Sequence, residues 1–136
     1  MNSILMSLDL SGNDLDDKYL KIMFEAFHKN FEIILTTLHL SNNQIDFEGG
    51  KVFAEALCVN TTLIDVYLGI NRLGNEDVIA LGVLFTKNTT LSTLNLCNNF
   101  INSRWIKTLS KSFHRHTALI FLNLSVNKLG FEDGKH

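Results

Sequence analysis

The sequence is poor in cysteine and has no long hydrophobic run. Its two cysteines, Cys58 and Cys97, occupy different places in the repeating pattern described below, so we expect no disulfide between them. No stretch approaches the ~20 consecutive apolar residues that a membrane-spanning helix needs. The first residues also lack the basic segment that precedes the apolar part of a secretory signal peptide. We therefore expect one soluble domain, residues 1–136, in a reducing intracellular compartment, the cytoplasm.

Motifs for metal or cofactor binding are also missing. His114 and His116 would point in different directions on a helix, and the two cysteines lie too far apart in the pattern to share an ion. The formal net charge is −2 and the isoelectric point is near 6.2, which argues against nucleic acid as a partner. The sequence thus predicts no cofactor, no metal ion and no nucleic-acid site.

What the sequence does contain is one phrase repeated five times, Leu-x-x-(Leu/Val)-x-Leu-x-x-Asn-x-(Leu/Ile). Spacings of 28 residues separate the last four copies, and the first spacing is 30. A fixed period with a fixed internal pattern is typical of one supersecondary unit stacked on copies of itself. The copies begin at Leu5, Leu35, Leu63, Leu91 and Leu119, and the last unit is incomplete.

Each unit predicts a short strand followed by a helix. Within the phrase, apolar residues alternate with mostly polar ones, as in a half-buried strand. The shared asparagine can both donate and accept, so stacked copies could satisfy peptide groups where the chain leaves the strand. These asparagines are Asn13, Asn43, Asn71, Asn99 and Asn127.

Between the phrases, the apolar spacing changes to that of a helix. Apolar residues three and four apart lie on one helical face, and in the fourth unit these are Ile106, Leu109 and Phe113. Helix N-caps are expected at Asp16 or Asp17, Asp46, Asn75 and Ser103. Left-handed residues after the helices are expected at Asn30, Asn60 and Asn88.

The repeating phrase, together with the helical segment between Gly49 and Leu63, resembles the ribonuclease-inhibitor-type leucine-rich repeats. The resemblance covers the chain from Leu5 through Gly134. It implies an α/β fold, a right-handed solenoid arc of about four and a half 28-residue repeats. Its parallel sheet would line the concave face and its helices the convex face. Members of this family bind unrelated proteins, so the resemblance implies a binding module without naming its partner.

Outward strand positions are where we expect a protein partner to bind. Adjacent strands lie ~4.8 Å apart, so the third and fifth residues of successive phrases form two parallel columns on the concave face. Aromatic, amide and carboxylate groups in these columns resemble the mixed surfaces that protein partners use. An alternative left open is that the aromatic residues only cover neighbouring strands. The predicted partner-binding residues are Asp9, His39, Asp65, Tyr67, Asn95, Phe121 and Asn123.

The same columns contain one pair of residues with catalytic potential. Asp9 and His39 would lie side by side, as does a carboxylate–imidazole pair that orients a general base. A nucleophile is lacking, because Cys97 would lie two strands beyond His39, and no lysine or arginine on this face would lower the pKa of Tyr67. We therefore predict a surface ion pair, worth ~1 kcal/mol or less, and no enzymatic activity.

The fourth helical segment carries a stripe of basic residues. Residues 91–118 contain four basic and no acidic residues, and the four fall on one helical face opposite the apolar one. Such a stripe could meet an acidic partner or an anionic membrane, but we favour a solvated face. The stripe consists of Arg104, Lys107, Lys111 and Arg115.

Two functions remain open from sequence. The first is a non-catalytic scaffold that holds a protein partner on its concave face. The second is a regulator, or a secreted bacterial effector acting in the host cytoplasm on a signalling protein such as a small GTPase. Because both ends of the array lack polar caps, self-association through the ends is an additional expectation, beside the alternatives that the last phrase covers the fourth repeat or that the chain is a fragment.

Overall fold

The computed structural model describes residues 5–30, 33–114 and 118–130. Within them, short strands alternate with helices, and one 3₁₀ turn precedes the third helix. The elements are β1 (Ser7–Asp9), α1 (Asp17–Lys29), β2 (Thr37–His39), α2 (Phe47–Val59), β3 (Asp65–Tyr67), η1 (Asn75–Asp77), α3 (Val78–Lys87), β4 (Thr93–Asn95), α4 (Ser103–Phe113) and β5 (Phe121–Asn123).

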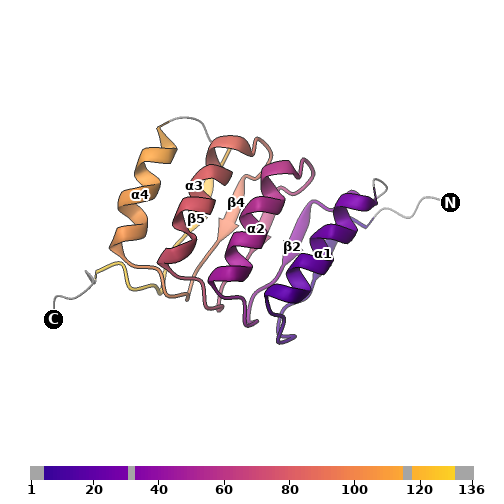
Figure 1. Cartoon of the computed structure of the whole chain (residues 1–136), viewed down its shortest axis with the longest axis horizontal. Coiled ribbons are helices and arrows are strands. Elements are labelled where there is room, and N and C mark those ends of the chain that lie inside the picture. Colours follow the sequence, from indigo (N-terminus) through magenta and orange to yellow (C-terminus); the bar gives the residue numbers. More distant parts are fainter. Residues whose placement is uncertain (1–4, 31–32, 115–117, 131–136) are drawn as a thin grey trace.

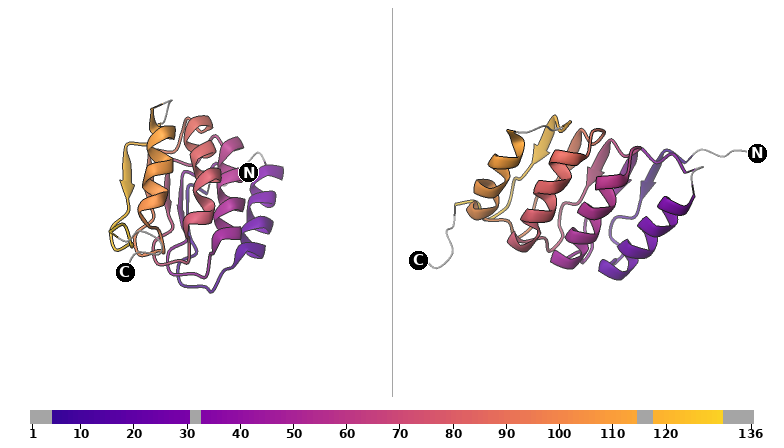
Figure 2. Two further views of the ribbon diagram at one scale, coloured as in Figure 1. Left: turned by 60° about the vertical axis from the view of Figure 1, so that its left-hand side comes forward. Right: turned by 45° about the horizontal axis from the view of Figure 1, so that its top comes forward.

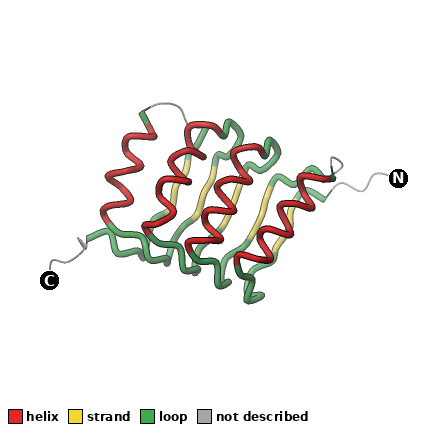
Figure 3. Tube along the Cα trace, viewed as in Figure 1, coloured by secondary structure: helices red, strands yellow, loops and turns green. Residues whose placement is uncertain are grey.

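The strands form one parallel sheet in sequence order, β1-β2-β3-β4-β5. The helices stand side by side on one face of this sheet and leave its other face uncovered (Figures 1 and 3). The view turned about the horizontal axis shows the same two layers, one of strands and one of helices (Figure 2). The predicted α/β solenoid arc, with its sheet on the concave face, is thereby confirmed.

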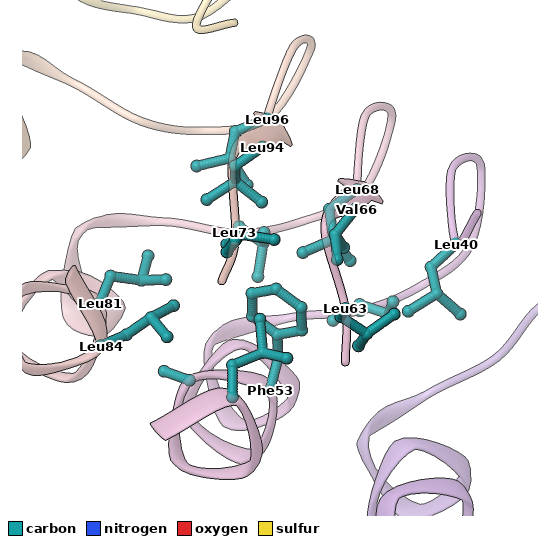
Figure 4. Close-up of a cluster of buried hydrophobic side chains, with 14 of the residues drawn as sticks. Leu40, Phe53, Leu63, Val66, Leu68, Leu73, Leu81, Leu84, Leu94 and Leu96 are labelled. Carbon is teal, nitrogen blue, oxygen red and sulfur yellow. The ribbon is translucent and has the colours of Figure 1, made fainter. Parts of the chain in front are cut away.

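The core lies between the two layers and is built from the same positions of every repeat. The fourth and sixth residues of the middle phrases, such as Val66 and Leu68 of β3 and its following turn, are fully buried. Phe53 of α2 points from the helix layer toward Leu63 and Leu73 (Figure 4). Removal of these apolar side chains from water supplies the main driving force for stacking one repeat on the next.

The repeated asparagines tie successive turns together, as the sequence predicted. Asn71 is 6% exposed. Its Oδ1 accepts from the amide of Ile45 at 3.1 Å, and its Nδ2 donates to the carbonyls of Leu40 and Leu68, each at 3.0 Å. Each bond to a residue of the preceding repeat replaces a partner that the chain loses where it leaves the strand.

The left-handed residues lie elsewhere than predicted. Asn30 and Asn60 have extended backbones, and Asn60 acts through its side chain, whose Oδ1 accepts from the amides of Thr62 and Leu63. Apart from Asp14, positive φ occurs instead at the eighth residue of every phrase, just before the repeated turn asparagine, because the chain reverses direction there. These residues are Gly12, Asn42, Ile70, Asn98 and Val126.

Helix starts agree with the sequence in part. Asp16 and Asp46 cap α1 and α2, each accepting from two backbone amides. The cap of α4 is Asn102 and not Ser103, which is the first helical residue. At the predicted Asn75 the chain first makes the 3₁₀ turn η1.

The inward face of α4 also differs from the prediction. Trp105 is fully buried together with Leu109, whereas Ile106 and Phe113 are 37% and 38% exposed. Trp105 lies four residues before Leu109 and therefore on the same helical face, and burial of its large indole removes more apolar surface from water than burial of an isoleucine would. The basic side of the helix stays on the outside.

Candidate interaction surface

The strand register brings the predicted concave residues into two columns. Asp9 pairs with His39 and His39 with Tyr67, and the column continues through Asn95 to Asn123. The neighbouring column contains Ser7, Thr37, Asp65, Thr93 and Phe121. All seven predicted partner-binding residues therefore lie on one face of the sheet, which the described helices do not cover (Figure 3).

His39 and Tyr67 form an aromatic stack in the middle of this face. Their ring centroids lie 4.5 Å apart, and the ring planes differ by 4°. The parallel register of β2 and β3 sets the separation, because side chains at paired positions of neighbouring strands are in contact distance. Both residues are half-buried, so the stacked rings stay partly accessible in a restricted orientation.

Asp9, Asn95 and Asn123 take part in their own turns. In each, the side-chain Oδ1 accepts from the amide two residues further on, at 2.9 Å. Hydrogen bonds from Ser11 are the main cause that lowers the pKa of Asp9, and the charge of His39 adds a smaller effect. Across the described residues no ion pair joins Asp9 to His39. The ion pair predicted from sequence is thus replaced by a turn at Asp9 and a ring stack at His39.

Among the seven predicted partner-binding residues, Asp65 and Phe121 have side chains that take part neither in the turn hydrogen bonds nor in the ring stack. Asp65 is half-buried, and its side chain makes no hydrogen bond or ion pair with residues 5–30, 33–114 or 118–130. Phe121 is 56% exposed on β5. Together with the aromatic stack, they give this face one carboxylate and three rings for contact with another molecule.

On the other side of the molecule, α4 carries the basic stripe. Arg104, Lys107 and Lys111 are exposed, as predicted, while Arg115 lies outside the described residues.

One contact at the rim of the sheet was not anticipated. The ammonium of Lys128 lies 5.3 Å from the ring centroid of Phe100, within the range of a cation–π interaction.

Chemical groups for catalysis or metal binding are sparse in what the structure describes. The residues searched contain no cluster of three or more histidine, cysteine or acidic side chains that could hold a metal ion. Cys58 and Cys97 are free thiols, and burial raises the pKa of Cys58. Among the described segments, no helix has the length and apolar character required to cross a bilayer.

Comparison with known proteins agrees with this architecture. A family model described as "Leucine Rich repeat" matches residues 2–18 and 34–54. The chain is 30% identical over 121 residues to the "Protein phosphatase 1 regulatory subunit 37 homolog" of Caenorhabditis elegans, which covers 89% of this chain and 13% of that protein. It is 32% identical over 130 residues to the "NACHT, LRR and PYD domains-containing protein 12" of Mus musculus, covering 95% of this chain and 12% of that protein.

The chain therefore spans only 12% to 13% of the length of these relatives. Among solved structures, "Leiomodin-1 Actin-Binding Site 2 (ABS2)" superposes with a TM-score of 0.78 and 20% identity, over 88% of this chain and 69% of that one. At this identity the likeness concerns the fold alone.

Proposed function

The chain is a leucine-rich repeat protein, and from this premise we propose that it is a non-catalytic module that holds a protein partner on its concave strand face. Domains of this kind generally mediate protein–protein interaction, and their folds present a surface without supplying a reaction of their own. The partner's identity does not follow from the relatives, because they share only a small part of their length with this chain.

The stack of His39 on Tyr67 is the observation that carries this proposal. A ring held in one orientation loses little conformational entropy when a partner covers it, and tyrosine is enriched among residues that dominate binding energies. A sheet face that served only to stay in water would not need these rings. Phe121 extends the apolar contact toward the β5 edge of the same face.

Alanine substitution at Tyr67 and Phe121 tests the proposal. The partner is first captured from cell lysate with the wild-type chain, identified by mass spectrometry, and then titrated against purified variants. We expect Tyr67→Ala with Phe121→Ala to weaken the affinity more than tenfold, corresponding to about 1.4 kcal/mol or more. Val59→Ala, which removes a 66% exposed side chain from the helix layer, is the matched control and should leave the affinity unchanged. Equal affinities for all three proteins would rule out the concave face.

A regulatory role is the second candidate, and the name of one relative, a regulatory subunit homologue of a protein phosphatase, favours it. In this version, the concave face binds a signalling enzyme, such as a phosphatase or a small GTPase, and changes its rate. Phosphatase and GTP-hydrolysis assays with and without the chain separate the two candidates. A rate change that Tyr67→Ala abolishes supports regulation, whereas binding without a rate change supports the scaffold. Both roles entail an intracellular, cytoplasmic location, which we propose as well and which imaging of a tagged chain tests.

A further inference from the structure

Helix α3 departs from the other helices at its outermost positions. The residues 16 and 20 places after the anchor leucine are charged in the first, second and fourth repeats and apolar in the third. The charged pairs are Lys21 and Glu25, Lys51 and Glu55, and Lys107 and Lys111, and the apolar pair is Ile79 and Val83. Three repeats show that this architecture accepts, and ordinarily carries, a solvated charged pair at these sites.

Exposure confirms that the apolar pair is not there to fill the core. Ile79 is 73% exposed and Val83 is 42% exposed, while the core of α3 is supplied by Leu81, Leu84 and Phe85. A surface helix normally presents polar residues on the face opposite its buried stripe. Two β-branched apolar side chains, one turn apart on that face, form a ridge that water contacts in the isolated chain.

Grooves border this ridge on both sides. Between α2 and α3, a groove of about 420 Å³ is lined by Phe47, Cys58 and Ala80 together with the ridge. Between α3 and α4, a second groove of about 320 Å³ is lined by Thr108, Lys111 and the same ridge residues. The helices stand parallel here (Figure 1), so the ridge and its grooves run along the helix axes. A ridge between two grooves offers a helical partner a line of apolar contact several residues long.

Charge on the two sides of the ridge limits the nature of the partner. On α4, Arg104, Lys107 and Lys111 are exposed, and the helix has no acidic residue. On the opposite side, Glu55 and Glu76 line the groove beside Lys51. The glutamates disfavour an anionic membrane, and the apolar ridge disfavours nucleic acid. An acidic partner segment finds complementary charge along α4.

We propose that the convex surface at α3 docks an amphipathic helix of a partner protein. The apolar stripe of that helix covers Ile79 and Val83, and its acidic flank lies along Lys107 and Lys111. This surface lies on the helix side of the molecule, opposite the concave strands, so the array can engage two partners at once. The proposal does not depend on the concave site.

A designed peptide serves as the probe. It has about 18 residues, roughly five helical turns, with leucines at every third and fourth position, glutamates on one flank and neutral glutamines on the other. A second peptide carries lysines in place of the glutamates. Binding is followed by NMR on the isotope-labelled full chain, with the methyl groups of Ile79 and Val83 as reporters.

We expect the glutamate peptide to shift both methyl signals and to bind at least fivefold more tightly than the lysine peptide. Ile79→Lys with Val83→Glu, which restores the residue types of α2, should raise the Kd of the glutamate peptide more than tenfold. Ile22→Lys is the control, since it removes an isoleucine that is 64% exposed from a different helix, α1. Lys111→Glu should reduce the preference for the glutamate peptide.

Several results would overturn the proposal. Equal binding by the wild type and the α3 double variant would place the peptide elsewhere, and equal affinity for the two peptides would remove the charge argument. Sedimentation velocity showing self-association that the double variant loses would assign the ridge to a second copy of the chain. Co-sedimentation with phosphatidylcholine–phosphatidylserine vesicles, lost in the same variant, would assign it to a lipid surface. Tyr67→Ala should leave peptide binding intact, so failure here is distinguishable from failure of the concave site.

Discussion

Replacement of Asn71 by alanine should destabilise the fold far more than the same replacement at Asn13. Asn71 is buried and bonds to four backbone groups: the amide of Ile45 and the carbonyls of Leu40, Leu68 and Gly69. The three carbonyls keep a second donor after the change, namely Asn43 Nδ2, Asn99 Nδ2 and the amide of Asn42, respectively. The amide of Ile45 keeps none in the described chain.

The magnitude follows from these partners. An orphaned buried amide costs about 1–3 kcal/mol, and loss of the side-chain donors adds about 0.5–1.5 kcal/mol, so the expected loss is about 2–4 kcal/mol. Asn13 is exposed, and its side chain donates only to the carbonyls of Leu10 and Ser11, so its replacement should cost less than about 1 kcal/mol.

Urea unfolding followed by circular dichroism measures the difference. With a slope of about 2 kcal/mol per molar urea, a loss of about 3 kcal/mol lowers the unfolding midpoint by roughly 1.5 M. Hydrogen exchange should show the specific cause, because the amide of Ile45 should lose its protection in Asn71→Ala and keep it in Asn13→Ala. Equal unfolding midpoints for the two variants, or an unchanged exchange rate at Ile45, would refute the claim that the hydrogen bonds of Asn71 stabilise the fold.

Three further changes are expected to have measurable effects. Ile70 is a β-branched residue at φ 54°, whereas the same position of the second and fourth phrases holds asparagine, Asn42 and Asn98. Ile70→Asn should therefore raise the free energy of unfolding by about 1 kcal/mol, which thermal unfolding measures as a higher Tm. The pKa of Asp9 is lowered in the folded chain, so the stability that this carboxylate contributes is present above its ordinary pKa of 3.8 and is lost as pH falls through the lower folded pKa. An NMR titration of Asp9 should give a pKa below the ordinary one, and Asp9→Asn should remove this part of the acid dependence of stability. Trp105 is fully buried, so its fluorescence should be blue-shifted and should shift to the red on unfolding, and Trp105→Ala should cost about 3–5 kcal/mol in the same urea assay.

Much of the fold could be predicted because the same physical requirement recurs in each repeat. Alternating apolar residues define each strand, and the fixed period defines which residues pair, so Asp9, His39 and Tyr67 fall in register as expected. The turn asparagines could be assigned a role because an amide side chain is suited to satisfying peptide groups on both sides.

Other features depend on local competition that the pattern does not reveal. The left-handed residue lies where the chain bends most, even when that residue is Ile70, so the asparagines after the helices were the wrong candidates. Trp105 takes the core place predicted for Ile106, because the positions four and three residues before Leu109 both lie near its helical face and spacing alone favours neither. On the concave face, adjacency predicted that His39 and Tyr67 would meet but not that their rings would stack, nor that Asp9 would turn to Ser11.

The turn asparagines also bear on how such a chain can change length. Asn43, Asn71 and Asn99 each donate to backbone carbonyls of their own repeat and of the repeat before it. Any adjacent repeat of the same kind would offer the same acceptors. Deletion or duplication of a whole 28-residue repeat would therefore bring matching repeats together again. A gain or loss of any other size inside the phrase would move the asparagine side chains away from the backbone groups to which they bond. Related genes should consequently differ by complete periods, with smaller insertions confined to the connections outside the strand and its turn.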